Sequence, residues 1–403
     1  MYDSIVIGAG PAGLTAASTC AHYNMKVLVI DEYMQAGGRL LGQLYEEPDG
    51  NWWNGIKESQ RLFEDAEIKG VEFMLSTPVN DIENSNDLWT IYTEQGAYQT
   101  KNLLLATGAA ESPIAVPGWT LPGVMSVGAA QVMTNVHRVK PGNRGIIIGV
   151  NVLSAAIAME LKLVDIEVTA LTLPEKNMVT QEAGDPKEVI KSLLHVSHMA
   201  PSKLVRYGSK FMKSNFMQNI GVKFYPKNGV KMWDIPIQLR RAVTEIYGDG
   251  KVEGVKLASI NSNGEVIAGS EKDIKLDFVC IAGGLYPLTE LAAIAGCPFY
   301  LVEELGGYIP LHNENMETPL SGLYVAGNIT GIEGAKVAAA QGKVAGLSMV
   351  ASFTGENMAA EIQYSVSETS DIRANAYIQF HPEINTGREK LSEQWNHSKL
   401  TKG

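Results

Sequence analysis

Three glycines near the N-terminus have the spacing of a phosphate-binding turn. They follow the apolar run 4–7, and the motif reads Gly8, Ala9, Gly10, Pro11, Ala12 and Gly13. At this spacing the first glycine turns the chain, the second lets a pyrophosphate approach the backbone, and the third lets a helix pack against the strand. The N-terminus of that helix faces the anion. The motif therefore predicts a dinucleotide site.

A carboxylate closes the same unit. The second apolar run, 27–30, is followed by Asp31, eighteen residues after Gly13, and then by Glu32. An acid at this distance can accept hydrogen bonds from the hydroxyls of an adenosine ribose. A glycine motif alone recurs by chance in glycine-rich turns. The two flanking apolar runs and the acid together favour the dinucleotide site.

The elements that must position these residues belong to a globular chain. With 403 residues, 45% of them hydrophobic, the sequence can form two or three domains. A formal net charge of −11 disfavours nucleic acid as the main partner, because phosphate binding requires a concentrated basic surface. The longest apolar stretch, 145–161, is interrupted by Asn151 and Ser154, so we interpret it as a strand and a helix rather than a transmembrane segment. The first strand begins at about residue 4, so we expect no secretory signal and a cytoplasmic protein.

The thiols and imidazoles of the chain suggest no separate reactive centre. Cys20, Cys280 and Cys297 include no CxxC pair, which excludes a thioredoxin-reductase-type disulfide, and three thiols are too few for the usual iron–sulfur ligands. We interpret them as buried apolar residues. His195 and His198 stand three residues apart on an expected helix, but without a nearby carboxylate we expect them at the surface. No metal site is predicted, and no catalytic acid or base is assigned.

A second unit repeats the strand–turn–helix–strand pattern of the N-terminus. The run 144–148 precedes Gly149, and a helix-like segment leads to the second run 166–173. Asn151 and Ser154 stand where the second and third glycines should be, and the second run ends without a carboxylate for a ribose. The sequence therefore predicts a duplicated fold in which the nucleotide-binding chemistry has faded.

A basic tract follows the second unit. Between Pro186 and Met232 there are nine lysines or arginines and one acid, Glu188. We expect this excursion of about 185–232 to be mostly helical. We interpret it as a solvated basic face, while a docking surface for an acidic partner stays open as the alternative.

Strand signals return after this tract. The runs 243–247, 252–260 and 265–268 are separated by turn residues and predict an antiparallel meander. Short apolar strands ending in glycine, at 103–108 and 278–283, close the two units in the same way. After Met358 the sequence becomes polar, and we expect an irregular tail.

Four ordered motifs resemble the two-dinucleotide-binding-domain FAD oxidoreductases, which are similar to the pyridine nucleotide-disulfide reductases. The motifs are GAGPAG with VLVID, GGR at 37–39, LLLATG at 103–108 and GLYVAGN at 322–328. The resemblance implies an α/β fold with two Rossmann-like domains, the second inserted in the first, each with a small antiparallel meander. The implied bounds are 1–115 and 286–360 for the FAD-binding domain, 116–285 for the inserted nucleotide-binding domain and 361–403 for the polar tail.

The resemblance also implies a set of FAD contacts in this sequence. Asn328 differs from the aspartate that is usual in the family, so we expect FAD to be retained with an altered charge beside it. Helix N–H groups beginning at Ala335 would stabilise negative charge on reduced flavin. The expected cofactor-binding residues are Gly8, Gly10, Pro11, Ala12 and Gly13 at the pyrophosphate, Asp31 and Glu32 at the ribose, Val79 at the adenine, Gly38, Arg39, Thr107 and Gly108 nearby, and Gly327, Asn328 and Ala335 at the flavin.

Within this superfamily the segments 106–109, 116–124 and 327–335 resemble the FAD-binding larger subunits of sarcosine oxidase, opine oxidase, proline or hydroxyproline dehydrogenase and hydrogen cyanide synthase. The resemblance implies an electron-transfer subunit of a hetero-oligomeric amino-acid or amine dehydrogenase or oxidase. Its expected partners are a ferredoxin-like subunit and a small flavoprotein catalytic subunit.

Two alternatives stay open at this point. The chain could be a stand-alone NAD(P)H-dependent flavin reductase of a small redox protein, with NAD(P) in the second site. It could instead be a flavin-loaded scaffold whose middle domain binds a non-redox nucleotide such as ATP. Asn151, Ser154 and the missing acid disfavour the reductase, whereas the basic tract fits the scaffold slightly better.

Overall fold

The computed structural model describes residues 1–47, 49–195, 221–226 and 228–400. The chain divides into two compact units: Met1–Gln43, Trp53–Ala110 and Leu285–Gly403 form the first, and Leu44–Trp52 and Glu111–Gly284 form the second. Residues 44–52, expected in the first domain, thus group with the second unit. In the described part of the chain, no helix is both long enough and apolar enough to cross a membrane. Residues 196–220 and 227, which include much of the basic tract and His198, lie outside the described residues.

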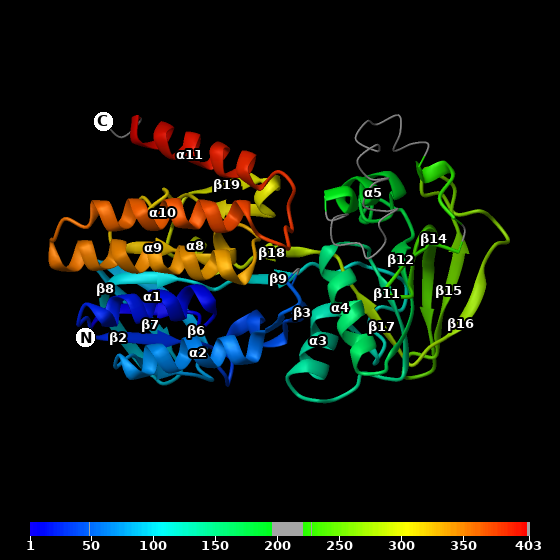
Figure 1. The fold of residues 1–403 in the computed structure, drawn as a ribbon, viewed down its shortest axis with the longest axis horizontal. Helices are drawn as coiled ribbons and strands as arrows, with labels where there is room; N and C mark the ends of the chain where they lie inside the picture. Colours follow the sequence, from blue (N-terminus) through cyan, green and yellow to red (C-terminus); the bar gives the residue numbers. More distant parts are fainter. Residues whose placement is uncertain (48, 196–220, 227, 401–403) are drawn as a thin grey trace. The chain divides into compact units, whose positions relative to one another are not determined.

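The first unit begins with alternating strands and helices, continues with the consecutive strands β5 to β8, and ends in three long helices (Figure 1). Its elements are β1 (Tyr2–Ile7), α1 (Pro11–His22), β2 (Val27–Ile30), the 3-10 helix η1 (Gly38–Gly42), α2 (Gly55–Ile68), β5 (Glu72–Met74), β6 (Val79–Ser85), β7 (Leu88–Thr93), β8 (Gly96–Leu105), β18 (Leu285–Pro287), α8 (Glu290–Ile294), β19 (Phe299–Val302), η3 (Glu303–Leu305), β20 (Gly307–Pro310), β21 (Leu323–Val325), η4 (Gly327–Thr330), α9 (Ala335–Thr354), α10 (Ala359–Ala374) and α11 (Ile384–Leu400). The short strands β4 (Trp52–Asn54) and β9 (Ala109–Glu111) cross the sequence boundaries between the units.

Seven strands form the main sheet of the first unit. Strand β1 runs parallel to both of its neighbours, and Ile7 lies opposite Ile30 of β2 and Leu105 of β8. The outer strands β5 and β21 are parallel to β2 and β8, whereas β7 and β6 extend the sheet in antiparallel fashion. All four residues of β2 are buried, so its sequence is continuously apolar as expected for a parallel strand covered on both faces.

The two faces of this sheet take alternate residues of each strand. Val6 belongs to the core that contains helices α1 and α9, while Ile5 and Ile7 belong to the core on the other face. Helix α9 packs along α1, and α10 packs along α9 (Figure 1). The carboxyl ends of β1, β2, β8 and β21 therefore meet the start of α1 and the corner before α9.

The expectation of an irregular tail after Met358 is wrong. Helix α10 buries Ile362, Ser365 and Thr369 along one face. Two of these three residues carry hydroxyl groups, so the buried stripe produces no hydrophobic periodicity in the sequence. Helix α11 contacts β19 and η3, and Ile384 and Leu391 complete a small apolar cluster there.

The second unit contains an eight-stranded sheet. Strands β10, β17, β11, β12 and β14 are parallel neighbours in that order, and β15 and β16 continue it in antiparallel fashion. The elements are β3 (Leu44–Glu46), β10 (Val124–Ser126), α3 (Val127–Asn135), β11 (Arg144–Ile148), α4 (Val152–Leu163), β12 (Glu167–Pro174), α5 (Pro186–His195), β13 (Val230–Met232), β14 (Ile235–Tyr247), β15 (Gly254–Ser259), β16 (Lys272–Lys275) and β17 (Phe278–Ile281).

The predicted meander forms, with one correction. Strands β14 and β15 cover the first two predicted runs and are antiparallel. The third strand is β16, not the run 265–268, which contributes only the single bridge between Ile260 and Val266. Three of the four residues of β16 are charged and exposed, and only Ile274 is half-buried, so an edge strand of this composition gives a weak sequence signal.

A buried carboxylate holds three segments of the second unit together. Glu160 of α4 accepts hydrogen bonds from the side-chain amides of Gln131, at 2.9 and 3.1 Å, and Asn135, at 2.6 Å, on α3. It also accepts one from the backbone N–H of Leu44, at 3.3 Å. Burial raises the pKa of Glu160 to about 8, while the amide donors lower it. The carboxylate thereby attaches α4 to α3 and to the segment 44–52.

We expect Glu160→Ala to lower the free energy of unfolding by about 3 kcal/mol or more, because it leaves several buried N–H donors without an acceptor. The matched control is Glu167→Ala, which removes an acid of the same unit from an exposed ion pair with Arg144 and should cost less than about 1 kcal/mol. Urea denaturation followed by circular dichroism measures both midpoints. Equal midpoints for the two variants would contradict the proposed role of Glu160.

Candidate functional site

The first glycine turn requires glycine at Gly8. Its φ is +107°, and a Cβ atom there would lie 2.3 Å from the carbonyl oxygen of Ala106. The N–H of Gly8 donates to the carbonyl of Ile30 at 2.8 Å, which fixes the turn to the end of β2. No other residue type fits this close approach of strand, turn and strand.

The next two glycines serve different purposes. A Cβ atom on Gly13 would lie 1.9 Å from the carbonyl oxygen of Gly8, so Gly13 permits the close contact between α1 and the turn. A Cβ atom on Gly10 would meet nothing within 4 Å. Gly10 is the N-cap of α1, no side chain caps this helix in the described structure, and Pro11 occupies its first turn. Gly10 therefore leaves open space in front of a positively polarised helix end.

The GGR corner lies against this open end. The N–H of Gly37 donates to the carbonyl of Ala9 at 2.7 Å, and a Cβ atom on Gly38 would lie 3.3 Å from the Cα of Gly10. Arg39 is half-buried and donates from Nε to the carbonyl of Ala109 at 2.9 Å. The corner at 37–39 thus connects the first glycine turn, through Ala9, with Ala109, which lies shortly after the end of β8.

Asp31 directly follows β2 and also holds the first glycine turn in place. Its carboxylate accepts the N–H of Ala9 at 2.6 Å and the N–H of Tyr33 at 2.8 Å. Burial raises the pKa of Asp31, and these two N–H donors act in the opposite direction. Each carboxylate oxygen keeps a further lone pair, so these bonds leave capacity for a ribose hydroxyl. Glu32 is exposed.

The remaining predicted residues are distributed along the same sheet edge. Thr77 donates its N–H to the carbonyl of Asp31 at 2.9 Å, two residues before the half-buried Val79 at the start of β6. Thr107 donates from Oγ1 to the carbonyl of Leu288 at 2.6 Å, and the carbonyl of Gly108 accepts the N–H of Leu288. Thr107 and Gly108 therefore connect the end of β8 to Leu288, which directly follows β18.

Gly327 lies against the start of α1, although the two are more than 300 residues apart. A Cβ atom on Gly327 would lie 2.9 Å from the Cβ of Ala12. One on Gly342 of α9 would lie 2.1 Å from the carbonyl oxygen of Ala12. Helix α9 therefore packs closely on α1, and glycines in α9 make this possible.

The two helices run in the same direction. Gly342 faces Ala12, and four residues further along α9, Gly346 faces Ala16 and Thr19. Ala12 is the second residue of α1 and Gly342 is the eighth of α9, so α9 begins six residues earlier, or about 9 Å further out. Its N-cap is Gly334, again without a side-chain cap in the described structure. Two open helix N-termini are thus offset along one line.

A network missed by the sequence analysis connects Gly327 to the start of α9. The Gln341 side chain accepts the N–H of Gly327 at 3.0 Å. The Thr330 hydroxyl donates to the backbone carbonyl of Gly327 at 2.8 Å. Asn328 accepts the N–H of Glu333 at 3.2 Å. Glu333 in turn accepts hydrogen bonds from Arg373 and Arg388, which lie far along the chain. No local sequence pattern connects these arginines to this corner.

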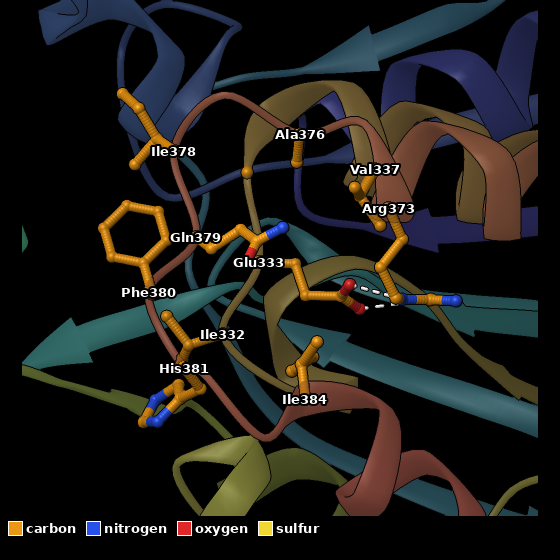
Figure 2. A pocket seen from close by; sticks show the side chains of 11 residues that line it. Ile332, Glu333, Val337, Arg373, Ala376, Ile378, Gln379, Phe380, His381 and Ile384 are labelled. Atoms are coloured by element: carbon orange, nitrogen blue, oxygen red, sulfur yellow. Dashed lines mark hydrogen bonds and ion pairs between the residues drawn. The ribbon is translucent and has the colours of Figure 1, made fainter. Parts of the chain in front are cut away.

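A small cavity lies beside the N-cap of α9. Its volume of about 20 Å³ has room for one water molecule. Figure 2 shows Glu333 pointing toward Arg373 on one side of it, with Ile378 and Phe380 of the segment before α11 on another. Residues of the segment 376–381, between α10 and α11, thus line this cavity together with Gly334.

Residues 2–342 match the pyridine nucleotide-disulphide oxidoreductase family, which is well over half of the chain. The chain belongs to this family. As a member, it is an FAD-dependent oxidoreductase.

Two curated relatives are similar over most of the chain. An opine oxidase subunit of Agrobacterium tumefaciens is 28% identical over 369 residues, covering 87% of this chain and 65% of that protein. The hydrogen cyanide synthase subunit HcnB of Pseudomonas protegens is 23% identical over 361 residues, covering 86% of this chain and 70% of that protein. The chain therefore spans about two thirds of the length of these relatives.

Solved structures confirm the predicted fold. The crystal structure of L-proline dehydrogenase from P. horikoshii has a TM-score of 0.64 at 19% identity and covers 91% of this chain and 58% of that one. The structure of T. acidophilum thioredoxin reductase has a TM-score of 0.61 at 22% identity and covers 87% and 98%. The α/β architecture of two Rossmann-like domains is thus shared.

The residues of the first unit fit the FAD of this family. The space in front of Gly10 accommodates close approach of a pyrophosphate, and the second open helix N-terminus, about 9 Å further along, suits the flavin end of an extended dinucleotide. By contrast, the three cysteines do not fit a disulfide centre. All of them are buried and unpaired, and burial raises the pKa of Cys20 and Cys297 to about 12 and that of Cys280 still further.

We expect the folded protein to release no colour with an aromatic disulfide reagent at neutral pH, because neither access nor thiolate is available at its three cysteines. The same protein in denaturant should react at all three. Rapid reaction of even one thiol in the native protein would show that a cysteine is exposed and contradict the burial described here.

We expect Gly10→Ala to leave the FAD-free fold intact and to weaken FAD binding about tenfold or more, because the added methyl occupies only the open space before α1. The matched variant Gly13→Ala should instead lower the free energy of unfolding by more than about 2 kcal/mol. Flavin fluorescence titration and thermal unfolding measure the two effects. Unchanged FAD affinity in Gly10→Ala would place the pyrophosphate elsewhere.

Proposed function

We propose that this chain is the FAD-carrying electron-transfer subunit of a hetero-oligomeric dehydrogenase or oxidase that acts on an amino acid or secondary amine. Two relatives are named as subunits, of opine oxidase and of hydrogen cyanide synthase, which supports this assignment. The structural observation that carries it is the contrast between the two glycine turns. The first is open, and the second is closed by its own side chains.

The two turns share their backbone geometry. Gly149 has φ +108° and a Cβ atom on it would lie 2.1 Å from the carbonyl oxygen of Ala282, much as Gly8 approaches Ala106. The N–H of Gly149 donates to Thr172 at 2.8 Å, as that of Gly8 donates to Ile30. By this register Leu173 occupies the place of Asp31, so the second turn has no ribose acceptor there.

The helix start differs more sharply. Asn151 is the N-cap of α4, and its Oδ1 accepts the N–H of Ser154 at 2.9 Å while the Ser154 hydroxyl oxygen accepts the N–H of Asn151 at 2.9 Å. The Asn151 amide also donates to the carbonyl of Ala282 at 2.9 Å. A capping box thus satisfies donors that a pyrophosphate would otherwise use. These features support a chain that does not take electrons from NAD(P)H.

FAD in the first unit would supply hydride and single-electron transfer when bound. The free backbone N–H groups at the starts of α1 and α9 would position it. The residues that we propose to contact FAD are Gly8, Gly10, Pro11, Ala12, Gly13, Asp31, Glu32, Gly38, Arg39, Val79, Thr107, Gly108, Gly327, Asn328 and Ala335. The described residues contain no cluster of metal-ligating side chains.

The proposed partners follow from the chemistry that we do not assign to this chain. We assign no acid or base for amine oxidation to the described residues around the first turn, and we place substrate oxidation on a small flavoprotein subunit. Any iron–sulfur centre would belong to a ferredoxin-like subunit, because this chain has only three cysteines and all are buried.

We expect NADH and NADPH to leave the flavin absorbance at about 450 nm unchanged under anaerobic conditions, whereas dithionite bleaches it. The variant Asn151→Gly, Ser154→Gly, Leu173→Glu reopens the second turn and should gain slow bleaching by NADH. Rapid bleaching of the unmodified chain would contradict the proposal and favour the stand-alone reductase. Retention of ATP without bleaching would favour the scaffold.

The subunit role has its own test. Co-expression with flavoproteins encoded by neighbouring reading frames should yield a complex whose flavins are reduced by an amino acid or secondary amine. The same substrate should not reduce the flavin of this chain alone. A chain that stays monomeric beside every such product would contradict the proposal.

A further inference from the structure

An arginine pair from the C-terminal helices surrounds a buried carboxylate at the start of α9. Arg373 of α10 donates to Glu333 from Nε at 2.5 Å and from Nη2 at 3.2 Å, and Arg388 of α11 donates to it from Nη2 at 2.5 Å. The side chains of Glu333, Arg373 and Arg388 are only 6%, 13% and 16% exposed. Three ionic groups have therefore been removed from water at one place, which is costly unless they are mutually compensated.

The compensation is incomplete, because one carboxylate faces two guanidinium groups. Against burial, which would raise it, Arg388 and Arg373 hold the pKa of Glu333 below its usual range, so Glu333 is ionised. Arginine keeps its proton in proteins. Among the described residues, no second carboxylate bonds to either arginine. The cluster of these three residues, the Glu333 triad, thus carries one uncompensated positive charge.

The neighbouring histidine does not change this count. Burial lowers the pKa of His312 to about 3, and the adjacent Arg388 acts in the same direction, so the imidazole is neutral. Its Nδ1–H donates to the carbonyl of Pro310 at 2.7 Å, which leaves Nε2 to accept from Arg388 at 3.3 Å.

The triad is attached to both parts of the proposed flavin end. Glu333 immediately precedes Gly334, the open N-cap of α9, and its N–H donates to Asn328. Arg388 donates to the hydroxyl of Thr330, which donates to the carbonyl of Gly327. In Figure 2 the Glu333 carboxylate meets Arg373 beside the backbone that enters α9. The buried charge and the positive end of the α9 dipole therefore lie together.

We propose that the Glu333 triad is an electrostatic positioning device that favours negative charge on the flavin, so that Arg373 and Arg388 raise the reduction potential of the bound FAD. This rests on the proposed placement of FAD between the first glycine turn and α9. Reduced flavin carries negative charge near N1 and O2, and a buried positive charge on the same side stabilises that form over the neutral oxidised form. The two C-terminal helices would then tune the cofactor without touching it.

The test compares three substitutions in the FAD-loaded protein. Arg373→Gln removes a positive charge, Glu333→Gln removes a negative charge, and Arg373→Lys keeps the charge but loses the bidentate geometry. The first readout is the flavin reduction potential from equilibration with a reference dye. The second is the dissociation constant for sulfite, which adds at flavin N5 and leaves negative charge at N1 and O2.

The charge mechanism requires shifts of opposite sign. Arg373→Gln should weaken sulfite binding about tenfold and lower the two-electron potential by the matching amount, about 30 mV. Glu333→Gln should tighten sulfite binding and raise the potential. Arg373→Lys should stay near the unmodified protein. The matched control Lys343→Gln removes a partly exposed lysine of α9, paired with Glu368, and should change neither readout.

A purely structural triad predicts a different pattern. Loosening of the C-terminal helices would lower the melting temperature in Arg373→Gln and Glu333→Gln alike and move both potentials in one direction or not at all. That result, with FAD still bound, overturns the inference and leaves the proposed function standing. A chain that binds no FAD overturns both.

Discussion

The close contact between α1 and α9 is the constraint on which the proposed cofactor site depends. Gly342 and Gly346 let α9 approach the backbone of α1, and Gly327 fits against Ala12. Because the helices run in the same direction with an offset of about 9 Å, two positively polarised ends face the same side of the sheet. A single methyl group at either helix glycine would separate them. Small residues thus bring segments from opposite ends of the sequence together in one proposed site, because each glycine lets α9 or its corner lie directly against α1.

The comparison of the two glycine turns separates fold from chemistry. Gly8 and Gly149 make the same turn with nearly the same φ and the same close approach to a neighbouring strand. This backbone geometry is required by the strand–turn–helix connection whether or not a nucleotide binds. What differs is the helix start, where Gly10 leaves N–H groups open and Asn151 covers them with a capping box. Side chains at two positions therefore decide whether the same turn leads into an open or a closed helix end.

Sequence reasoning predicts local features of this protein well and distant ones poorly. The strands, turns and helices around Gly8, Asp31 and Gly327 follow from apolar runs and glycines that lie within a few residues of each other. The role of Asp31 as a brace for the N–H of Ala9 is not visible in the sequence, because it depends on how the turn closes. Helix α10 escapes prediction because its buried face includes Ser365 and Thr369. Arg373 and Arg388 are 40 and 55 residues from Glu333, and only the packing of α10 and α11 reveals their common partner.

The same packing places two arginines where the burial of charge is costly. If the C-terminal helices needed only an anchor, apolar residues of similar size would hold them at least as well, because a buried ion cluster contributes little net stability. Removing one partner would nevertheless be destabilising, so stability alone cannot distinguish an anchor from a charge that acts on a neighbour. The distinguishing property is the sign of the uncompensated charge and its position at the open end of α9. Among the described residues, the two arginines exceed their common carboxylate partner, Glu333, by one charge, and that excess makes no further ion pair there. In the proposed arrangement, this excess positive charge stabilises an anion in front of the N-terminus of α9.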